Sequence, residues 1–232
     1  MKHIISNIGE LNATKAAIAE KSGRRGEDIL LVAVTKTRTT QEINAAIDAG
    51  ITDIGENKVQ EILDKFEKVK PVKWHMIGHL QTNKVKYIID KVSMIHSVDS
   101  LRLAEEIDRR AAANGSIMDV LIQINASGEE SKFGIACCET DELIVEIADH
   151  FKNIRIRGLM TIAPFEEDPE QVRQYFKAVH EYFMKYIELS LPGTDFKYLS
   201  MGMSNDFPVA IEEGSNLIRV GTAIFGRRNY NL

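Results

Sequence analysis

Short apolar runs alternate with longer amphipathic stretches along almost the whole chain. Eight runs rich in valine, isoleucine and leucine are typical of buried strands, at residues 29–34, 53–55, 73–77, 94–97, 118–124, 154–158, 196–199 and 217–220. Seven stretches with a helical pattern lie between them, at residues 41–49, 58–68, 82–90, 100–113, 139–151, 169–189 and 205–213. A regular alternation of strand and helix predicts parallel βαβ units.

The count of elements favours an α/β barrel of the TIM type, (β/α)₈. Only six residues follow Gly226, so the eighth outer helix is not expected after the last strand. The amphipathic segment from about residue 4 to residue 21 can take its place. An open doubly wound sheet is the alternative, but Thr35 and Lys36 follow the first strand where that fold usually has a glycine-rich turn. Without a linker or repeat, residues 1–232 are expected to form a single domain.

Composition and charge narrow the possible partners. The 232 residues carry a formal net charge of −5, and the lysines and arginines form no basic stripe, so nucleic acid is not expected as a partner. The two cysteines, Cys137 and Cys138, are neighbours and offer no disulfide framework, which indicates a reducing compartment. We find no secretory signal and no apolar run of about 18 residues that could span a membrane. A cytoplasmic protein is therefore expected.

Lys36 is the first candidate for chemistry. It follows the first predicted strand, and barrels of this type build their active sites at the carboxyl ends of the strands. A lysine placed near apolar walls and other cations can act as an amine nucleophile towards an aldehyde. The alternative is a solvated lysine at a strand end, and its position alone does not decide between the two.

The loops after the seventh and eighth strands are the usual phosphate site of phosphate-using barrels. Ser200, Met201 and Gly202 open a turn that leads into a predicted helix, where backbone N–H groups can face an anion. Gly221 and Thr222 follow the eighth strand and would close the site from the other side. Each signal is weak alone, because such turns are common caps. Their coincidence with Lys36 favours a ligand that carries a phosphate.

Arg219 is a charged residue within an apolar strand, on the same face as Gly221. A buried arginine needs a partner, and this one could pair with a core carboxylate or point at the ring of a cofactor. His75 and His79 have the spacing of helical metal ligands, but their surroundings predict a strand, so no metal site is expected.

Several motifs together resemble the pyridoxal phosphate homeostasis protein family. They are TKT at 35–37, GEN at 55–57, HMIGHLQTNK at 75–84, SKFG at 131–134, GLM at 158–160, SMGMS at 200–204 and RVGTAIFG at 219–226. The resemblance runs nearly end to end, and the segments that begin at residues 75, 200 and 219 are highly specific in combination.

The resemblance implies a pyridoxal 5′-phosphate (PLP) barrel of fold type III, like the N-terminal domain of alanine racemase, with PLP bound as a Schiff base to Lys36. Carried over by position, the cofactor contacts would be the phosphate site at Ser200, Met201, Gly202, Gly221 and Thr222, Arg219 at the pyridine nitrogen, and Asn57 near the ring. Family members are regarded as keeping reactive PLP in check, with possible delivery to apo-enzymes and effects on amino-acid pools.

Two other activities would use the same cavity. A related amino-acid racemase needs a second base, which such enzymes take from a separate C-terminal domain, and this chain ends at Leu232 straight after the barrel. Arginine at the pyridine nitrogen would also weaken PLP as an electron sink. A phosphate-sugar enzyme would need an acid/base pair, for which Glu56 and His79 are the visible candidates. We therefore expect a monomeric PLP carrier or regulator with negligible turnover.

Overall fold

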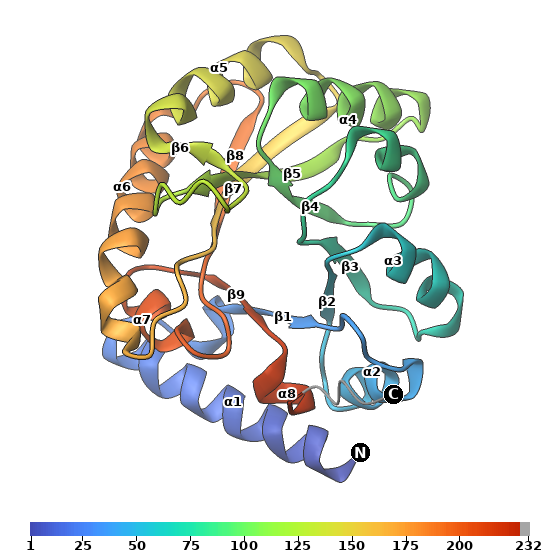
Figure 1. Ribbon diagram of the computed structural model, residues 1–232, viewed down its shortest axis with the longest axis vertical. Coiled ribbons are helices and arrows are strands. Elements are labelled where there is room, and N and C mark those ends of the chain that lie inside the picture. The colour runs from blue at the N-terminus through green and yellow to red at the C-terminus, as the bar shows by residue number, and fades with distance from the viewer. Residues whose placement is uncertain (228–232) are drawn as a thin grey trace.

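Eight parallel strands close into a barrel around the core of the protein. The computed structural model describes residues 1–227. The barrel strands are β1 (Leu30–Val34), β2 (Asp53–Glu56), β3 (Lys73–Met76), β4 (Met94–Val98), β5 (Met118–Asn125), β7 (Ile154–Thr161), β8 (Thr194–Ser200) and β9 (Leu217–Val220). They lie in the order β4-β3-β2-β1-β9-β8-β7-β5, and pairing of β4 with β5 closes the ring (Figure 1). The predicted (β/α)₈ barrel is confirmed.

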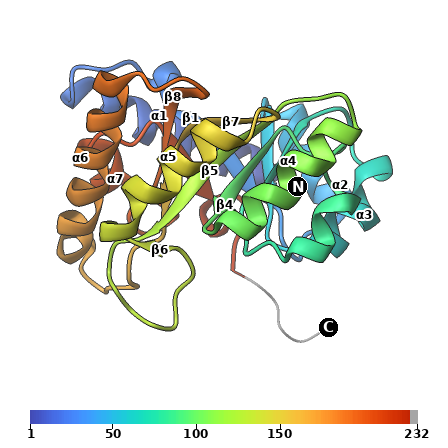
Figure 2. The same cartoon turned by 90° about the horizontal axis from the view of Figure 1, so that it is seen from above.

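The helices form an outer layer around the strands (Figures 1 and 2). They are α1 (Lys2–Lys21), α2 (Thr40–Asp48), α3 (Val59–Lys65), α4 (Leu101–Ala113), α5 (Thr140–His150), α6 (Arg173–Leu189), α7 (Phe207–Glu212) and α8 (Thr222–Phe225). Helix α1 packs against α2, α7 and α8, so the N-terminal segment completes the outer layer as predicted. Within residues 1–227, no helix combines the length and the apolar character needed to cross a membrane.

Several elements differ from the sequence-based expectation. Strand β7 ends at Thr161, three residues later than predicted, and the short helix α8 was not predicted. The predicted helix at 82–90 is a 3₁₀ helix over Thr82–Tyr87. A further strand, β6 (Ile135–Ala136), pairs with β5 and was not predicted, because two residues are too short to show a period. Strand β8 ends at Ser200, one residue later than predicted, which places the Ser200 side chain within the barrel wall.

Helix α2 begins at a reciprocal cap that fixes the chain just after Lys36. The Thr39 hydroxyl accepts a hydrogen bond from the Glu42 backbone N–H at 3.3 Å, and the Glu42 carboxylate accepts from the Thr39 N–H at 2.8 Å. This capping box satisfies two N–H groups that the first helical turn would otherwise leave unpaired. The short loop between β1 and α2 is thereby anchored at its far end.

Gly9 offers a simple test of the packing of α1. It is exposed within the helix, and a Cβ added to it would meet nothing within 4 Å. Alanine is favoured over glycine in helix interiors, so Gly9→Ala is expected to raise the free energy of unfolding by about 0.5–1 kcal/mol, measured by urea denaturation. Gly26→Ala is the control and should destabilise, because its Cβ would lie 2.8 Å from the Ala16 Cβ. An unchanged or lower stability of Gly9→Ala would contradict the exposed position.

Candidate functional site

A cavity of about 590 Å³ opens at the carboxyl ends of β1, β8 and β9. Its walls are contributed by residues 34, 36 and 38 at the end of β1 and in the following loop, 165 after β7, 203–205 after β8, and 219, 221–223 and 227 from β9 onwards. Four of the predicted site residues, Lys36, Arg219, Gly221 and Thr222, therefore line one cavity. The shared rim explains this, since parallel strands present their carboxyl ends on the same side of a barrel.

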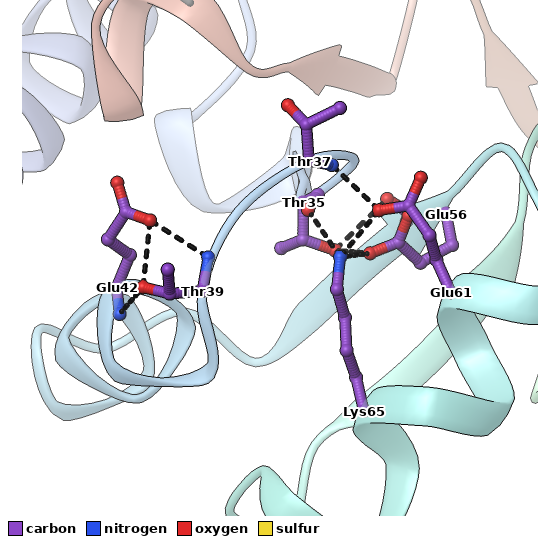
Figure 3. A network of polar contacts seen from close by, with 8 residues as sticks. Thr35, Thr37, Thr39, Glu42, Glu56, Glu61 and Lys65 are labelled. Carbon is purple, nitrogen blue, oxygen red and sulfur yellow. Dashed lines mark hydrogen bonds and ion pairs between the residues drawn. The ribbon is translucent and has the colours of Figure 1, made fainter. Parts of the chain in front are cut away.

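The turn that carries Lys36 is held by a buried ion-pair network, shown in Figure 3. The Lys65 ammonium donates to the Thr35 carbonyl at 2.9 Å and to the carboxylates of Glu56 and Glu61, both at 2.7 Å. The Thr35 hydroxyl also donates to Glu56 at 2.7 Å. We call the group Thr35, Glu56, Glu61 and Lys65 the Lys65 clamp. It holds the residue that precedes Lys36.

The residue after Lys36 is fixed by the same clamp. Thr37 has a φ of +65°, in the left-handed region that L-residues other than asparagine, aspartate and histidine seldom adopt. Its backbone N–H donates to the Glu61 carboxylate at 2.7 Å (Figure 3). With Thr35 and Thr37 both bound, the backbone of Lys36 has little freedom to move. The clamp therefore sets the direction in which the Lys36 side chain leaves the strand end.

The pKa values of the two carboxylates of the clamp are shifted in opposite directions. Burial raises the pKa of Glu56, although the hydrogen bond from Lys65 acts to lower it. For Glu61, burial acts to raise the pKa, but hydrogen bonds from Lys65 and from the Thr37 N–H outweigh it and the pKa is lowered. One oxygen of Glu56, Oε2, is buried and has no hydrogen-bond partner among the described residues. The charge of Lys65 is thus the main compensation for a fully buried carboxylate.

Several cations face the cavity, which makes it suited to an anionic ligand. Lys36, Arg38, Arg219 and Arg227 all line it. Arg38 donates to the Gly226 carbonyl at 2.5 Å, which fixes its guanidinium beside the turn after β9. Burial lowers the pKa of Arg219 to about 10, and Asp206 acts in the opposite direction, so this guanidinium is charged at neutral pH. The local excess of positive charge is what a phosphate dianion requires.

The loops after β8 and β9 lie close together on one side of the cavity. The Ser204 hydroxyl accepts a hydrogen bond from the Ala223 backbone N–H at 3.3 Å and links the two loops. Gly202 has a φ of +93°, and a Cβ there would lie 2.6 Å from the Ala210 Cβ. At Gly221 a Cβ would lie 3.3 Å from the Val34 Cβ, so this turn packs tightly against the end of β1. Gly202 thus allows the loop after β8 to pack against α7, and Gly221 allows the turn after β9 to pack against β1.

Not all predicted site residues reach this cavity. Ser200 and Met201 are fully buried, and they and Gly202 stand outside its lining. Asn57 lines a neighbouring cavity of about 540 Å³ on the same rim, together with His79. A third cavity, of about 510 Å³, lies at the amino ends of the strands, where Leu30 and Thr52 line it. The cofactor contacts assigned to Ser200, Met201, Gly202 and Asn57, and to the four residues that line the first cavity, stay predictions.

The two histidines considered as metal ligands lie in different environments. His75 is buried within the barrel, where its ring nitrogens contact Asp53 and His96. His79 lies on the rim, and its ring stacks on Phe133 with 4.0 Å between the centroids. Within residues 1–227, no group of three or more histidine, cysteine, aspartate or glutamate side chains is placed to hold a metal ion.

Comparison with known proteins agrees with the fold. Residues 11–229 match the model of the family "Alanine racemase, N-terminal domain". A pyridoxal phosphate homeostasis protein of Aquifex aeolicus is 44% identical over 216 residues, which cover 91% of this chain and 92% of the relative. The protein of the same name from Escherichia coli is 39% identical over 236 residues, which cover 100% of this chain and 99% of the relative.

Solved structures give the same picture. A protein described as unknown from Bifidobacterium adolescentis has a TM-score of 0.89 at 37% identity, covering 97% of this chain and 95% of that one. PipY of Synechococcus elongatus, solved with PLP bound, has a TM-score of 0.81 at 30% identity, covering 96% and 100%. An alanine racemase of Clostridium difficile, 15% identical, shares the fold with a TM-score of 0.77. The full-length identities show that this chain belongs to the pyridoxal phosphate homeostasis protein family.

Proposed function

We propose that this protein holds PLP as a Schiff base on Lys36 and takes part in intracellular PLP homeostasis. The observation that carries the proposal is the position of Lys36, which lines the cavity together with Arg38, Arg219 and the Gly221 turn. A relative with which it shares 30% identity over nearly the whole chain, PipY, has been solved with PLP bound. The homeostasis role is supported by the name that the full-length relatives share.

The residues of the cavity fit the chemistry of PLP. A volume of about 590 Å³ is within the range of about 300–1,000 Å³ that is usual for small-molecule sites. PLP supplies an electrophilic aldehyde carbon, a phosphate and an aromatic ring when it is bound. Lys36 provides the amine, and Val34, Phe165 and Met203 provide apolar surface for a ring. Arg38 and Arg227 add positive charge, and the Gly221 turn lets backbone approach the ligand closely.

The role proposed for each predicted contact follows from its place. Gly221 and Thr222 line the cavity and would contact the phosphate, with Ser200, Met201 and Gly202 beneath it. Arg219 would face the pyridine nitrogen, and Asn57 would lie beyond the ring on the side of the neighbouring cavity. A guanidinium can only donate hydrogen bonds. The pyridine nitrogen that faces it would therefore be the acceptor and would carry no proton.

We propose that turnover is negligible and that the protein buffers PLP or delivers it to apo-enzymes. An unprotonated pyridine nitrogen makes PLP a weaker electron sink, which disfavours the removal of a substrate proton. The names of the relatives describe homeostasis and no reaction. Cys137 and Cys138 are free thiols, which fits a reducing cytoplasm. We further propose that the protein acts as a monomer.

The attachment site is tested by borohydride reduction of the PLP-loaded protein followed by peptide mapping. We expect the modified peptide to contain Lys36, and Lys36→Ala to lose both the adduct and the absorption band of the PLP Schiff base. Lys152→Ala, at an exposed position far along the chain, is the matched control and should be modified like the wild type. Modification at another lysine would overturn the assignment. Turnover of L-amino acids at ordinary enzyme rates would contradict the carrier role.

A further inference from the structure

A continuous chain of hydrogen bonds crosses the interior of the barrel below the cavity. Its members are Asp53 of β2, His75 of β3, His96 of β4, Ser200 of β8 and Arg219 of β9, each at most 3% exposed. In order, Asp53 Oδ1 lies 2.8 Å from His75 Nε2, His75 Nδ1 lies 2.9 Å from His96 Nε2, and His96 Nδ1 lies 3.2 Å from Ser200 Oγ. Arg219 Nη1 lies 2.5 Å from the same Oγ. Five strands thus contribute to one network.

The chemistry of the donors gives this chain a single direction. A guanidinium has only donors, so Ser200 Oγ accepts from Arg219 and must place its own hydrogen elsewhere. Within the described residues the other partner of that hydroxyl is His96 Nδ1, which therefore accepts. The proton of His96 is then on Nε2 and is donated to His75 Nδ1. The proton of His75 is on Nε2 and is donated to the Asp53 carboxylate.

The electrostatics of the two ends agree with this assignment. His96 is fully buried, and burial together with the neighbouring His75 and Arg219 puts its pKa well below the ordinary value, so the ring is neutral. Burial acts to raise the pKa of Asp53, but hydrogen bonds from His75 and Thr52 outweigh it and the pKa is lowered. The chain therefore runs from a guanidinium cation to a carboxylate anion, and each hydrogen bond polarises the next in the same sense.

The chain ends on the residue that faces the cavity. Arg219 Nη1 also donates to the Ser200 carbonyl at 2.8 Å, and Nη2 donates to the Thr161 carbonyl at 2.8 Å. These bonds hold one edge of the guanidinium against β7 and β8, while Arg219 lines the cavity. Three of its five N–H groups are used in this way. The orientation of the remaining donors towards a ligand thus depends on the position of Ser200 Oγ.

We propose that Asp53, His75, His96 and Ser200 are positioning residues, which orient the Arg219 guanidinium for the pyridine nitrogen of PLP through one directed hydrogen-bond chain. The part that concerns PLP rests on the proposed function, whereas the direction of the chain does not. A carboxylate at the far end of the barrel, well removed from the cavity, is thereby coupled to the binding site.

The direction is tested without PLP, by ¹⁵N NMR of the histidine side chains in the cofactor-free protein. We expect both His75 and His96 to carry their proton on Nε2. Asp53→Asn keeps the size of the side chain but can donate to His75, and it should move the proton of both rings to Nδ1. Wild-type rings with the proton on Nδ1, or a change confined to His75, would overturn the directed chain.

The coupling to the cofactor is tested by a double-mutant cycle on the dissociation constant of PLP. Asp53 and Ser200 are separated by two histidines, so any coupling between them must pass through the chain. We expect Ser200→Ala to raise the dissociation constant by about tenfold, the effect of one hydrogen bond to a charged group. Asp53→Asn is expected to raise it by about three- to tenfold. The double variant should resemble Ser200→Ala alone and not the product of the two effects.

His150→Ala is the matched control, because His150 is an exposed histidine on α5 and should leave the dissociation constant unchanged within about twofold. Multiplicative effects of Asp53→Asn and Ser200→Ala, or an unchanged affinity of Ser200→Ala, would overturn the positioning role. Should the wild type bind no PLP, the proposed function fails, while the NMR assignment still shows whether the hydrogen-bond chain has the proposed direction. If a variant does not fold, the tautomers of His75 and His96 in the wild type still test the direction of the hydrogen-bond chain.

Discussion

Replacing Lys65 by methionine is expected to lower the free energy of unfolding by about 3–5 kcal/mol, because the substitution leaves buried carboxylates without their counter-charge. The Glu56 side chain is fully buried and one of its oxygens already lacks a partner among the described residues. Methionine fills a similar volume, so lost packing contributes little and the loss reports the charge. Urea denaturation followed by circular dichroism measures the effect.

A surface ion pair provides the control for this substitution. Lys70 pairs with Asp48 at a site where both side chains are about half exposed, and Lys70→Met should cost less than about 1 kcal/mol. Similar losses in the two variants would contradict a special role of the clamp. Lys65→Met should also slow the formation of the PLP adduct, since the Thr35 carbonyl loses its bond from Lys65, and Glu61, which accepts from the Thr37 N–H, loses the ion pair that holds it.

The loss in Lys65→Met is expected to depend on pH. Burial raises the pKa of Glu56 above its ordinary value of 4.5, and removing Lys65 takes away the largest opposing contribution, so the pKa rises further. A carboxyl with a raised pKa in the folded state stabilises the protein below the unfolded-state pKa, and this contribution is lost as pH rises through the folded-state pKa. The stability deficit of Lys65→Met should therefore be smaller near pH 5 than near pH 8. A deficit that does not change over this interval would argue that Glu56 keeps an ordinary pKa.

The barrel could be predicted from the sequence because its strands and helices differ clearly in period. All eight barrel strands lie where the apolar runs place them, and the N-terminal helix completes the outer layer. What escaped prediction is short or irregular. Two residues of β6 show no alternation, and the turn of 3₁₀ helix at Thr82–Tyr87 has the same polar and apolar pattern as a short α-helix.

The cavity was predictable to the extent that it depends on strand ends. Lys36, Arg219, Gly221 and Thr222 lie at the ends of two adjacent strands, and such positions meet at one rim in any barrel of this type. Ser200 was expected in the loop, but β8 runs one residue further and directs its hydroxyl to Arg219 and His96. Successive residues of a strand face opposite sides of the barrel wall, so Ser200, as the last residue of β8, faces the side opposite to Leu199.

The Lys65 clamp and the interior chain could not be found by the same reasoning. Glu61 and Lys65 have the i,i+4 spacing of an ordinary surface pair on a helix, and only the tertiary structure buries Lys65 against Glu56. His96 gave a weaker signal that was available, namely a polar ring within a fully buried strand. Its partners come from strands that are far apart in the sequence, so the pairing needs the closed barrel.

The position of Arg219 leaves room for both alternatives considered from the sequence. The carboxylate of Asp53 is linked to Arg219 through three intervening side chains and does not contact it directly. The same guanidinium lines the cavity at its other side. A direct ion pair would have neutralised the charge that faces the ligand, whereas a hydrogen-bonded chain orients the guanidinium and leaves its charge available. The interior of this barrel is therefore a polar support for the site as well as a core.

Gly158→Ala is expected to destabilise the protein by about 4 kcal/mol, because backbone strain and steric overlap, each about 1–3 kcal/mol, act together at this position. Gly158 lies in β7 with a φ of +142°, and a Cβ there would stand 1.8 Å from the Tyr198 carbonyl oxygen of β8. The pairing of β7 with β8 shifts register between Ile156 and Gly158, so the glycine sits where the two strands realign. Thermal and urea denaturation measure the loss.

Gly50→Ala separates the two causes. Gly50 has a φ of +98°, but a Cβ there would meet nothing within 4 Å, so this variant should show backbone strain alone, about 1–2 kcal/mol. Equal losses in the two variants would show that the contact with Tyr198 is not a constraint. Because β7 and β8 carry Thr161 and Ser200, which bind Arg219, Gly158→Ala should also weaken PLP binding in the fraction that folds, whereas Gly50→Ala should not. Strand register in the barrel wall would thereby be tied directly to the orientation of the guanidinium at the site.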